Sequence, residues 1–182
     1  MHTSSLCIGI GLLGFLVGCN RSADTPLVAS GKEVWVSQDF ENLRGWTSPA
    51  NAASLTTEKA HSGKFAIKTG PGVDYSLGFK AKLGDLSATR PLKLHLEAWV
   101  WVPGANSTTS LVIHVGNPEK SIMWEGIKLA EKAGEFGEWK KVETDVMIKP
   151  EVTYADTLSV YMWGAQEAAP VYLDDLVITE VE

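Results

Sequence analysis

The stretch LKLHLEAWVWV, residues 92–102, decides the fold of this chain. Its even positions are all aliphatic, whereas its odd positions carry charged, imidazole or indole side chains. A period of two over this length predicts a long β-strand, because successive side chains of a strand point to opposite faces. The even face is predicted to lie in a core. The odd face carries Trp99 and Trp101, which favours an aromatic surface over a merely solvated one.

Other strand-like runs recur along the chain, and Gly, Pro and Asn separate them. They cover residues 33–40, 54–60, 64–69, 75–83, 109–115, 121–129, 139–148, 158–163 and 171–181. Only residues 127–132 have helical character, and Gly134 and Gly137 cut this segment short. About ten strands with almost no helix predict an all-β fold, an antiparallel β-sandwich or barrel.

Charge restricts the partners that this chain can bind. The 182 residues include 22 acidic and 16 basic side chains, for a formal net charge of -6. Nucleic acids and anionic membrane surfaces are bound through basic patches, so neither is expected as the main partner.

The first twenty residues, MHTSSLCIGIGLLGFLVGCN, contain no Asp, Glu, Lys or Arg. Their apolar run, residues 6–17, is too short to span a bilayer and is typical of a secretory signal peptide. Leu16-Val17-Gly18-Cys19 resembles the lipobox of bacterial lipoproteins, which implies cleavage before Cys19 and lipidation of its thiol. An ordinary signal peptide is the alternative.

The expected organisation is a lipoprotein signal peptide over residues 1–18, a flexible tether over residues 19–31 and a folded domain over residues 32–182. Several acyl chains on Cys19 would make a stable membrane anchor. The lipobox resemblance thus places the protein in the bacterial cell envelope. Asn20 follows the cysteine instead of Asp, which favours the outer membrane or the cell surface over the inner membrane.

Five short motifs follow one another along the domain. They are Asp39-Phe40-Glu41 before Trp46, Ala60-His61-Ser62-Gly63-Lys64, Leu94–Val100, Gly137-Glu138-Trp139-Lys140-Lys141 and Tyr172-Leu173-Asp174-Asp175-Leu176. In this order, over residues 33–181, they resemble the CenC-type carbohydrate-binding modules. The resemblance implies a jelly-roll β-sandwich of the galactose-binding-like class. It also implies a polysaccharide or oligosaccharide ligand, and a place beside glycan-degrading or glycan-importing proteins.

The same resemblance implies a structural calcium ion held by Glu41, the backbone of Lys64, and Asp174. Calcium takes six to eight oxygen ligands, often from carboxylates and carbonyls. Asp174 and Asp175 are adjacent in an apolar strand, so one of them is expected to face inward, where a carboxylate needs a partner. The alternative to calcium is that Asp174 accepts backbone N–H groups or pairs with a lysine.

Flat aromatic side chains with nearby polar groups suit sugar rings, which have apolar C–H faces and a rim of hydroxyls. Residues 158–163 also alternate, with Tyr161 and Trp163 on the expected outer face. If this strand neighbours residues 92–102, as the jelly-roll resemblance implies, the aromatics of both strands share one concave sheet. The predicted ligand-binding residues are Trp99, Trp101, Tyr161, Trp163, His95 and Glu97, which Tyr75, His114 and Trp124 could join.

Catalysis is not predicted. Glycoside hydrolysis needs two carboxylates across a cleft, and Glu97 and Glu125 are the candidate pair. The chain lacks the Glu-x-Asp-x-x-Glu strand motif of jelly-roll glucanases and a nucleophile elbow, and its histidines lack zinc-ligand spacing. Non-catalytic glycan binding is therefore the favoured interpretation. A structural or protein-interaction lipoprotein of the same fold is the alternative, and a small glycoside hydrolase is a third.

Overall fold

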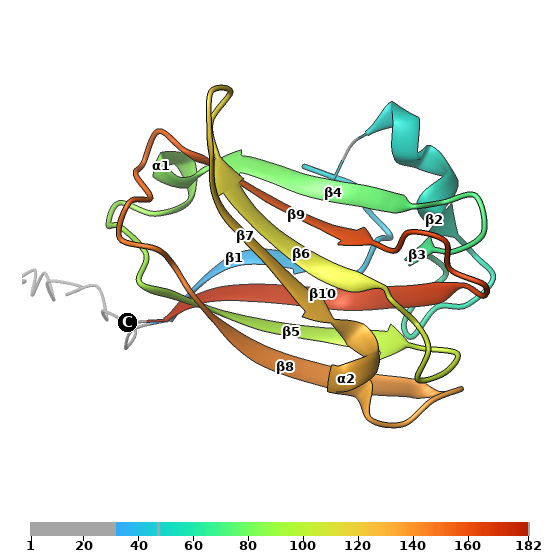
Figure 1. Ribbon diagram of the computed structural model, residues 1–182. Helices are drawn as coiled ribbons and strands as arrows, with labels where there is room; N and C mark the ends of the chain where they lie inside the picture. The colour runs from blue at the N-terminus through green and yellow to red at the C-terminus, as the bar shows by residue number, and fades with distance from the viewer. Residues whose placement is uncertain (1–31, 47, 182) are drawn as a thin grey trace, which may run out of the picture.

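Two antiparallel sheets stacked face to face form the domain (Figure 1). The computed structural model describes residues 32–46 and 48–181. The predicted signal peptide, Cys19 and the tether lie outside the described residues. Within them the fold is an all-β antiparallel sandwich, as the sequence predicts. No helix among these residues has the length and apolar character needed to cross a membrane.

The six-stranded sheet has the order β2-β3-β10-β5-β8, and β1 also pairs with β10. Its strands are β1 (Lys32–Gln38), β2 (Leu55–Thr56), β3 (Ala66–Thr69), β5 (Lys93–Trp101), β8 (Trp139–Met147) and β10 (Val171–Val181). The four-stranded sheet has the order β4-β9-β6-β7. Its strands are β4 (Tyr75–Lys82), β6 (Ser110–Gly116), β7 (Ser121–Lys128) and β9 (Thr157–Trp163).

Three short helices connect the strands. They are the 3₁₀ helix η1 (Pro49–Ser54), α1 (Leu83–Leu86) and α2 (Leu129–Ala133). The helical character predicted for residues 127–132 is found in α2, which ends at Gly134 with a left-handed φ of 68°. The strand expected over residues 54–60 has only two residues, because η1, with Pro49 in its first turn, occupies the chain just before it.

The alternation of β5 produces the division between core and surface that the sequence predicts. Leu94, Leu96, Ala98 and Val100 are at most 2% exposed, whereas each odd residue is half-buried on the outer face. Leu92 departs from the prediction, since its side chain is 50% exposed. The pairing of β5 begins only at Lys93, and Leu92 contributes just its carbonyl, which accepts the N–H of Ile148.

A β-bulge in β10 changes the placement of the two aspartates. The β10–β5 register shifts between Asp174 and Val177, and Asp175 has a left-handed φ of 47°. In the β10–β5 register, Asp174 is opposite Trp99, whose side chain is on the outer face, so the side chain of Asp174 is on the outer face as well. The expectation that one aspartate faces the sandwich interior is therefore wrong. Asp174 is fully buried on the outer face, and its carboxylate accepts the N–H groups of His61 and Ser62.

The contrast between two leucines tests this division between core and surface. Leu96→Ala should lower the free energy of unfolding by about 2–5 kcal/mol, because it leaves a cavity between the sheets. Leu92→Ala, the same substitution at an exposed position, should change it by less than about 0.5 kcal/mol. Urea unfolding of both variants measures the difference. Equal losses would contradict the described start of β5.

Candidate functional site

The predicted ligand-binding residues are divided between the two sheets. β5 pairs with β10 and β8, whereas β9 pairs with β4 and β6. The expectation that these two strands are neighbours is therefore wrong. Trp99, Trp101, His95 and Glu97 lie on the outer face of the six-stranded sheet, and Tyr161 and Trp163 lie on the outer face of the four-stranded sheet. One trough cannot contain both sets.

The two tryptophans of β5 are partly covered by the loop between β2 and β3. The imidazole of His61 stacks on Trp99, with ring centroids 3.8 Å apart and planes 11° from parallel. The ammonium of Lys59 lies 4.5 Å from the ring centroid of Trp101, which is cation–π geometry. The platform that the sequence predicts on this face is thus occupied by the chain itself.

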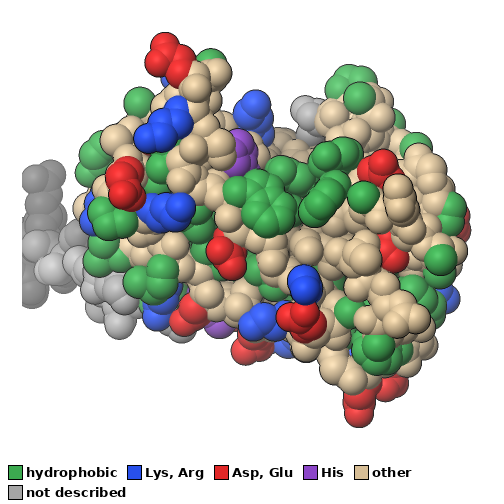
Figure 2. Space-filling model, viewed as in Figure 1, with side chains coloured by type: hydrophobic (Ala, Val, Ile, Leu, Met, Phe, Trp, Pro, Cys, Tyr) green, Lys and Arg blue, Asp and Glu red, His purple; other side chains and the backbone are tan. Residues whose placement is uncertain are grey.

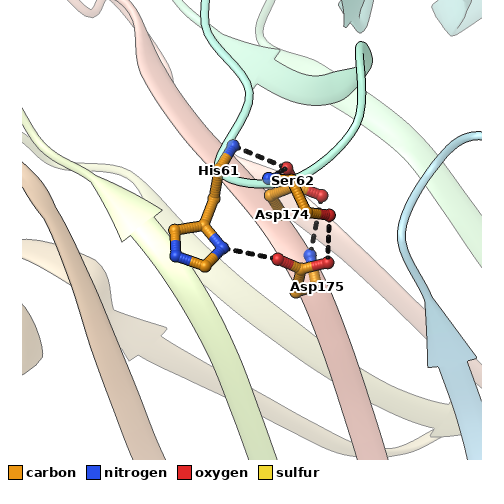
Figure 3. Close-up of polar contacts among 4 residues, drawn as sticks. All are labelled: His61, Ser62, Asp174 and Asp175. Atoms are coloured by element: carbon orange, nitrogen blue, oxygen red, sulfur yellow. Dashed lines mark hydrogen bonds and ion pairs between the residues drawn. The ribbon is translucent and has the colours of Figure 1, made fainter.

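Two aspartates of β10 hold this covering loop in place (Figure 3). Asp174 Oδ2 accepts the N–H groups of His61 at 2.8 Å and Ser62 at 3.1 Å. Asp175 accepts the Ser62 hydroxyl at 2.7 Å, and it contacts His61 Nδ1 at 2.6 Å. Burial raises the pKa of Asp174, and the backbone N–H groups that it accepts oppose this rise. These bonds give Trp99 and its covering loop a structural role.

The predicted calcium ligands already have hydrogen-bond donors. Glu41 Oε1 accepts the N–H groups of Lys64 at 2.5 Å and Phe65 at 2.8 Å, and Asp174 accepts those of His61 and Ser62. In the described part of the chain, no group of three or more His, Cys, Asp or Glu side chains is arranged to hold a metal ion. Calcium at Glu41, the backbone of Lys64, and Asp174 stays a prediction from the resemblance.

His95 and Glu97 take part in ion pairs across β5 and β8. His95 Nδ1 lies 2.6 Å from Asp145, and Glu97 lies 2.6 Å from the ammonium of Lys141. The hydrogen bond that Lys141 donates lowers the pKa of Glu97, and the bonds that Lys141 donates to Glu143 and Glu97 raise the pKa of Lys141 to about 12. Glu125 is on β7 in the other sheet, so Glu97 and Glu125 do not form the carboxylate pair that hydrolysis would need.

The outer face of the four-stranded sheet forms a regular grid. Paired residues of antiparallel strands share a face, and Tyr161 lies on the outer one because Val160 and Met162 are fully buried. In the order β4-β9-β6-β7, the outward rows are Tyr75–Trp163–Ser110–Lys128, Gly78–Tyr161–Val112–Gly126, Lys80–Ser159–His114–Trp124 and Lys82–Thr157–Gly116–Ser121. Tyr75, His114 and Trp124 thus join Tyr161 and Trp163, apart from the tryptophans of β5.

Four aromatic side chains form two contacting pairs on this face. The Trp124 and Trp163 centroids are 6.1 Å apart with ring planes inclined at 79°, and those of Tyr75 and Tyr161 are 6.0 Å apart. Trp124 and Tyr75 remain 50% and 48% exposed. In Figure 2, hydrophobic side chains gather over β6 and β7 on this side of the molecule. The exposed part of this aromatic surface is therefore Trp124 and Tyr75, and Tyr161 and Trp163 are half-buried beside them.

Residues without large side chains let the aromatics lie close to the sheet. A Cβ atom on Gly126 would come within 2.5 Å of Trp124 Cη2, so the indole covers this glycine. Val112 lies between Tyr161 and Gly126 in its row and is fully buried, although it faces outward. Sequence reasoning missed both positions. Only the strand register, which places a glycine and a valine among aromatics, could have identified them.

Polar groups line a hollow beside the tyrosines. This hollow has a volume of about 390 Å³ and lies between β4, β9 and η1. Ser48, Asn51, Lys80 and Ser159 are among its lining residues, together with Tyr75 and Tyr161. In the same row as Lys80 and Ser159, His114 Nε2 lies 3.0 Å from Ser121 Oγ. Hydrogen-bonding groups therefore accompany the aromatic rings.

A buried glutamate fixes the loops at the Trp163 end of the face. Glu167 Oε1 accepts the Ser107 hydroxyl at 2.9 Å, the Thr108 N–H at 2.6 Å and the Thr109 hydroxyl at 2.8 Å. Burial raises the pKa of Glu167, but the hydrogen bonds from Thr109, Ser107 and Thr108 outweigh burial, so the pKa is lowered overall. The loop before β6 is thereby joined to the loop after β9.

No protein-family model matches the sequence, and neither does any curated protein. Solved structures do match its fold. The CBM22-1 xylan-binding domain of Paenibacillus barcinonensis Xyn10C is 18% identical, with a TM-score of 0.51 over 85% of this chain and 98% of that one. A structure described as Family 16 Carbohydrate Binding Module-2 is 15% identical, with a TM-score of 0.54 over 80% of this chain and 99% of the other.

A third match is the CBM22-1–GH10 part of Clostridium thermocellum Xyn10B, complexed with xylohexaose. It is 14% identical, with a TM-score of 0.51 over 82% of this chain and 28% of that chain. At such identities the likeness concerns the fold, and these neighbours belong to families 22 and 16 rather than to the CenC type. The chain thus has a β-sandwich fold similar to that of solved carbohydrate-binding modules.

The hydrogen bonds to Glu167 predict a pH dependence of stability. Because folding lowers the pKa of Glu167, the ionised carboxylate stabilises the folded state at pH values above its unfolded-state pKa of about 4.3. This stabilisation is lost as the pH falls through the folded-state pKa. Glu167→Gln should therefore cost about 1.5–3 kcal/mol at pH 7 and much less near pH 2.5. Urea midpoints at both pH values measure this. Glu119→Gln, at an exposed turn position, is the control with the same charge change. A cost of Glu167→Gln that is independent of pH would contradict the prediction.

Proposed function

We propose that this protein binds polysaccharide without catalysis, on the outer face of its four-stranded sheet. The observation that carries the proposal is the gathering of Tyr75, Trp124, Tyr161 and Trp163 on this one face, beside the polar hollow. Aromatic rings can stack on the apolar faces of sugars, and the serine, asparagine and lysine side chains can bond their hydroxyls. This moves the sugar site from β5 to β9 and its neighbours.

The geometry favours a single glycan chain over a flat crystalline surface. The indoles of Trp124 and Trp163 are inclined at 79°, so they cannot both lie flat on one plane of sugar rings. Each aromatic contact contributes about 0.5–1.5 kcal/mol beyond its buried area. Against association costs of several kcal/mol, a few such contacts correspond to a Kd between about 1 mM and 1 μM.

The structural neighbours support this proposal. Their descriptions name xylan binding for the Paenibacillus domain and a complex with xylohexaose for the Clostridium protein. A shared fold is a weak guide to function by itself, so the proposal depends on the aromatic face of this chain. A closer relationship to the CenC-type modules remains part of the proposal, on the five motifs described above.

Protein interaction is the main alternative, because exposed aromatic side chains such as Trp124 and Tyr75 also suit a protein partner. A glycoside hydrolase is less favoured, since Glu97 and Glu125 lie on different sheets and Glu97 is paired with Lys141. The proposed setting is the bacterial envelope, where a lipid anchor on Cys19 would hold the domain near glycan-degrading or glycan-importing proteins.

The two sheets allow a matched test of the site. Trp163→Ala and Tyr161→Ala should each weaken retention in affinity gels containing xylan, glucomannan or mixed-linkage β-glucan by about two- to tenfold. Trp99→Ala, on the opposite outer face, should leave retention unchanged. Thermal melting checks that the variants are folded. If Trp99→Ala alone weakened retention, the site would lie on the six-stranded sheet, and if no polysaccharide retarded the protein, the protein-interaction alternative would be favoured.

The anchor has its own test, because it concerns a residue outside the described domain. Bacterial cells that express the full chain should incorporate a palmitate analogue into the protein and retain it in the membrane fraction. Cys19→Ser should abolish labelling and release the protein into the soluble fraction, since the thiol that carries the lipid is lost. Cys7→Ser is the control and should be labelled normally. Labelling that persists in Cys19→Ser would exclude this anchor.

A further inference from the structure

The outer face of the four-stranded sheet carries basic side chains on a protein that is acidic as a whole. Its outward rows contain Lys80, Lys82, Lys128 and His114, and none of their positions in the described strands is Asp or Glu. The whole chain nevertheless has a formal net charge of -6. The carboxylates are therefore located elsewhere.

The outer face of the six-stranded sheet differs, because lysines of β5 and β8 there are paired with carboxylates. On the six-stranded sheet, Lys93 lies 3.2 Å from Asp145, and Lys141 lies 2.6 Å from Glu97. Lys80 and Lys82 form no ion pair with any residue that the structure describes. Lys128, at the far edge on β7, does pair with Glu131 at 3.1 Å. Among the lysines in the outward rows of this face, the two without an ion pair to a described residue are therefore on β4.

Lys80 is placed where a bound sugar chain would reach it. It lines the 390 Å³ hollow together with Tyr75 and Tyr161, and its row continues through Ser159 and His114 to Trp124. Glu125 on β7 does not belong to this row, because it pairs with the fully buried Ile113 and so occupies the opposite side of the strand. An ammonium group is therefore combined with aromatic platforms in one surface.

We propose that the polysaccharide is acidic, and that carboxylates of its uronic acid residues pair with Lys80 and Lys82 while the sugar rings contact the aromatics. This inference rests on the proposed function and names the class of glycan. A lysine ammonium has three N–H donors and no acceptor, which suits a carboxylate. The carboxylates on the outer face of the other sheet are paired with lysines, and they lie beyond both layers of a sandwich whose sheets stack about 10 Å apart, which is farther than the Debye length of about 10 Å at 0.1 M salt.

Matched polysaccharides test the inference directly. Glucuronoxylan, polygalacturonate and alginate would each be compared with its carboxyl-reduced form, which keeps the backbone and removes the charge. At 0.1 M NaCl, at least one acidic form should bind about threefold or more tightly than its reduced form, as two exposed ion pairs would give. At 1 M NaCl, where the Debye length is about 3 Å, this preference should disappear.

Variants then assign the preference to β4. Lys80→Gln should weaken binding of the acidic form by about 1.5- to fivefold more than binding of the reduced form, and adding Lys82→Gln should remove most of the preference. Lys132→Gln, an exposed lysine on α2 away from this face, has the same charge change and should have no effect.

The outcomes separate this inference from the proposed function. If every reduced form bound as well as its acidic form, and binding still required Tyr161 and Trp163, the acidic class would be wrong and the glycan site would stand. A preference that persisted in the double lysine variant would also overturn the inference. If no form of any of these polysaccharides bound, the inference and the glycan site would fall together.

Discussion

Antiparallel pairing of β5 between β10 and β8 is the constraint on which the rest of the structure depends. The pairing fixes the register of β5, and the register fixes which of its side chains fill the space between the sheets. Because Leu94, Leu96, Ala98 and Val100 are on the inner side, His95, Glu97, Trp99 and Trp101 must be on the outer side. A slip of one residue would expose the aliphatic set and bury two charged groups, which is far too costly.

The two outer faces use aromatic residues for different purposes. On the six-stranded sheet, the bulge in β10 presents Asp174 and Asp175 to the loop that carries His61, and His61 stacks on Trp99. The burial of Asp174 is compensated by backbone N–H groups, so this loop is part of the folded domain. On the four-stranded sheet, Gly78 and Gly126 leave room beside Tyr161 and Trp124, and Trp124 stays half exposed while Tyr161 is half-buried.

Charge follows the same division between the faces. The outer side of β5 and β8 alternates acids with bases, which pair across the strands and stabilise the sheet. The outer side of β4 and β9 has lysines, hydroxyls and tyrosines with no carboxylate in register. Charged and polar side chains with a structural role tend to form ion pairs and hydrogen bonds with one another. A binding surface keeps such side chains free to contact its ligand. By this criterion, the face of β4, β9, β6 and β7 is the one that we propose as the binding surface.

Local alternation in the sequence determined most of the strands and the side on which each residue lies. The period of two in β5 and β9 identified their buried and outward sets, because the strand backbone imposes that period wherever a strand forms. It also identified Tyr161 and Trp163 as outward residues. The start of β5 at Lys93 and the helix η1 were not predicted, since pairing partners and turns elsewhere in the chain set these boundaries.

Only the tertiary structure decided which outward faces lie together. β5 and β9 have the same alternation of buried and outward residues. Nothing in either strand's sequence indicates that β5 pairs with β10 and that β9 pairs with β4 and β6. Likewise, Trp99 could be recognised as covered only once the bulge at Asp175 brought the His61 loop onto it. Alternation is a property of a single strand, whereas the pairing of one strand with another depends on contacts between segments far apart in the chain. The sequence therefore determined the outward aromatic side of each strand, and the fold decided that the two sides lie on different sheets.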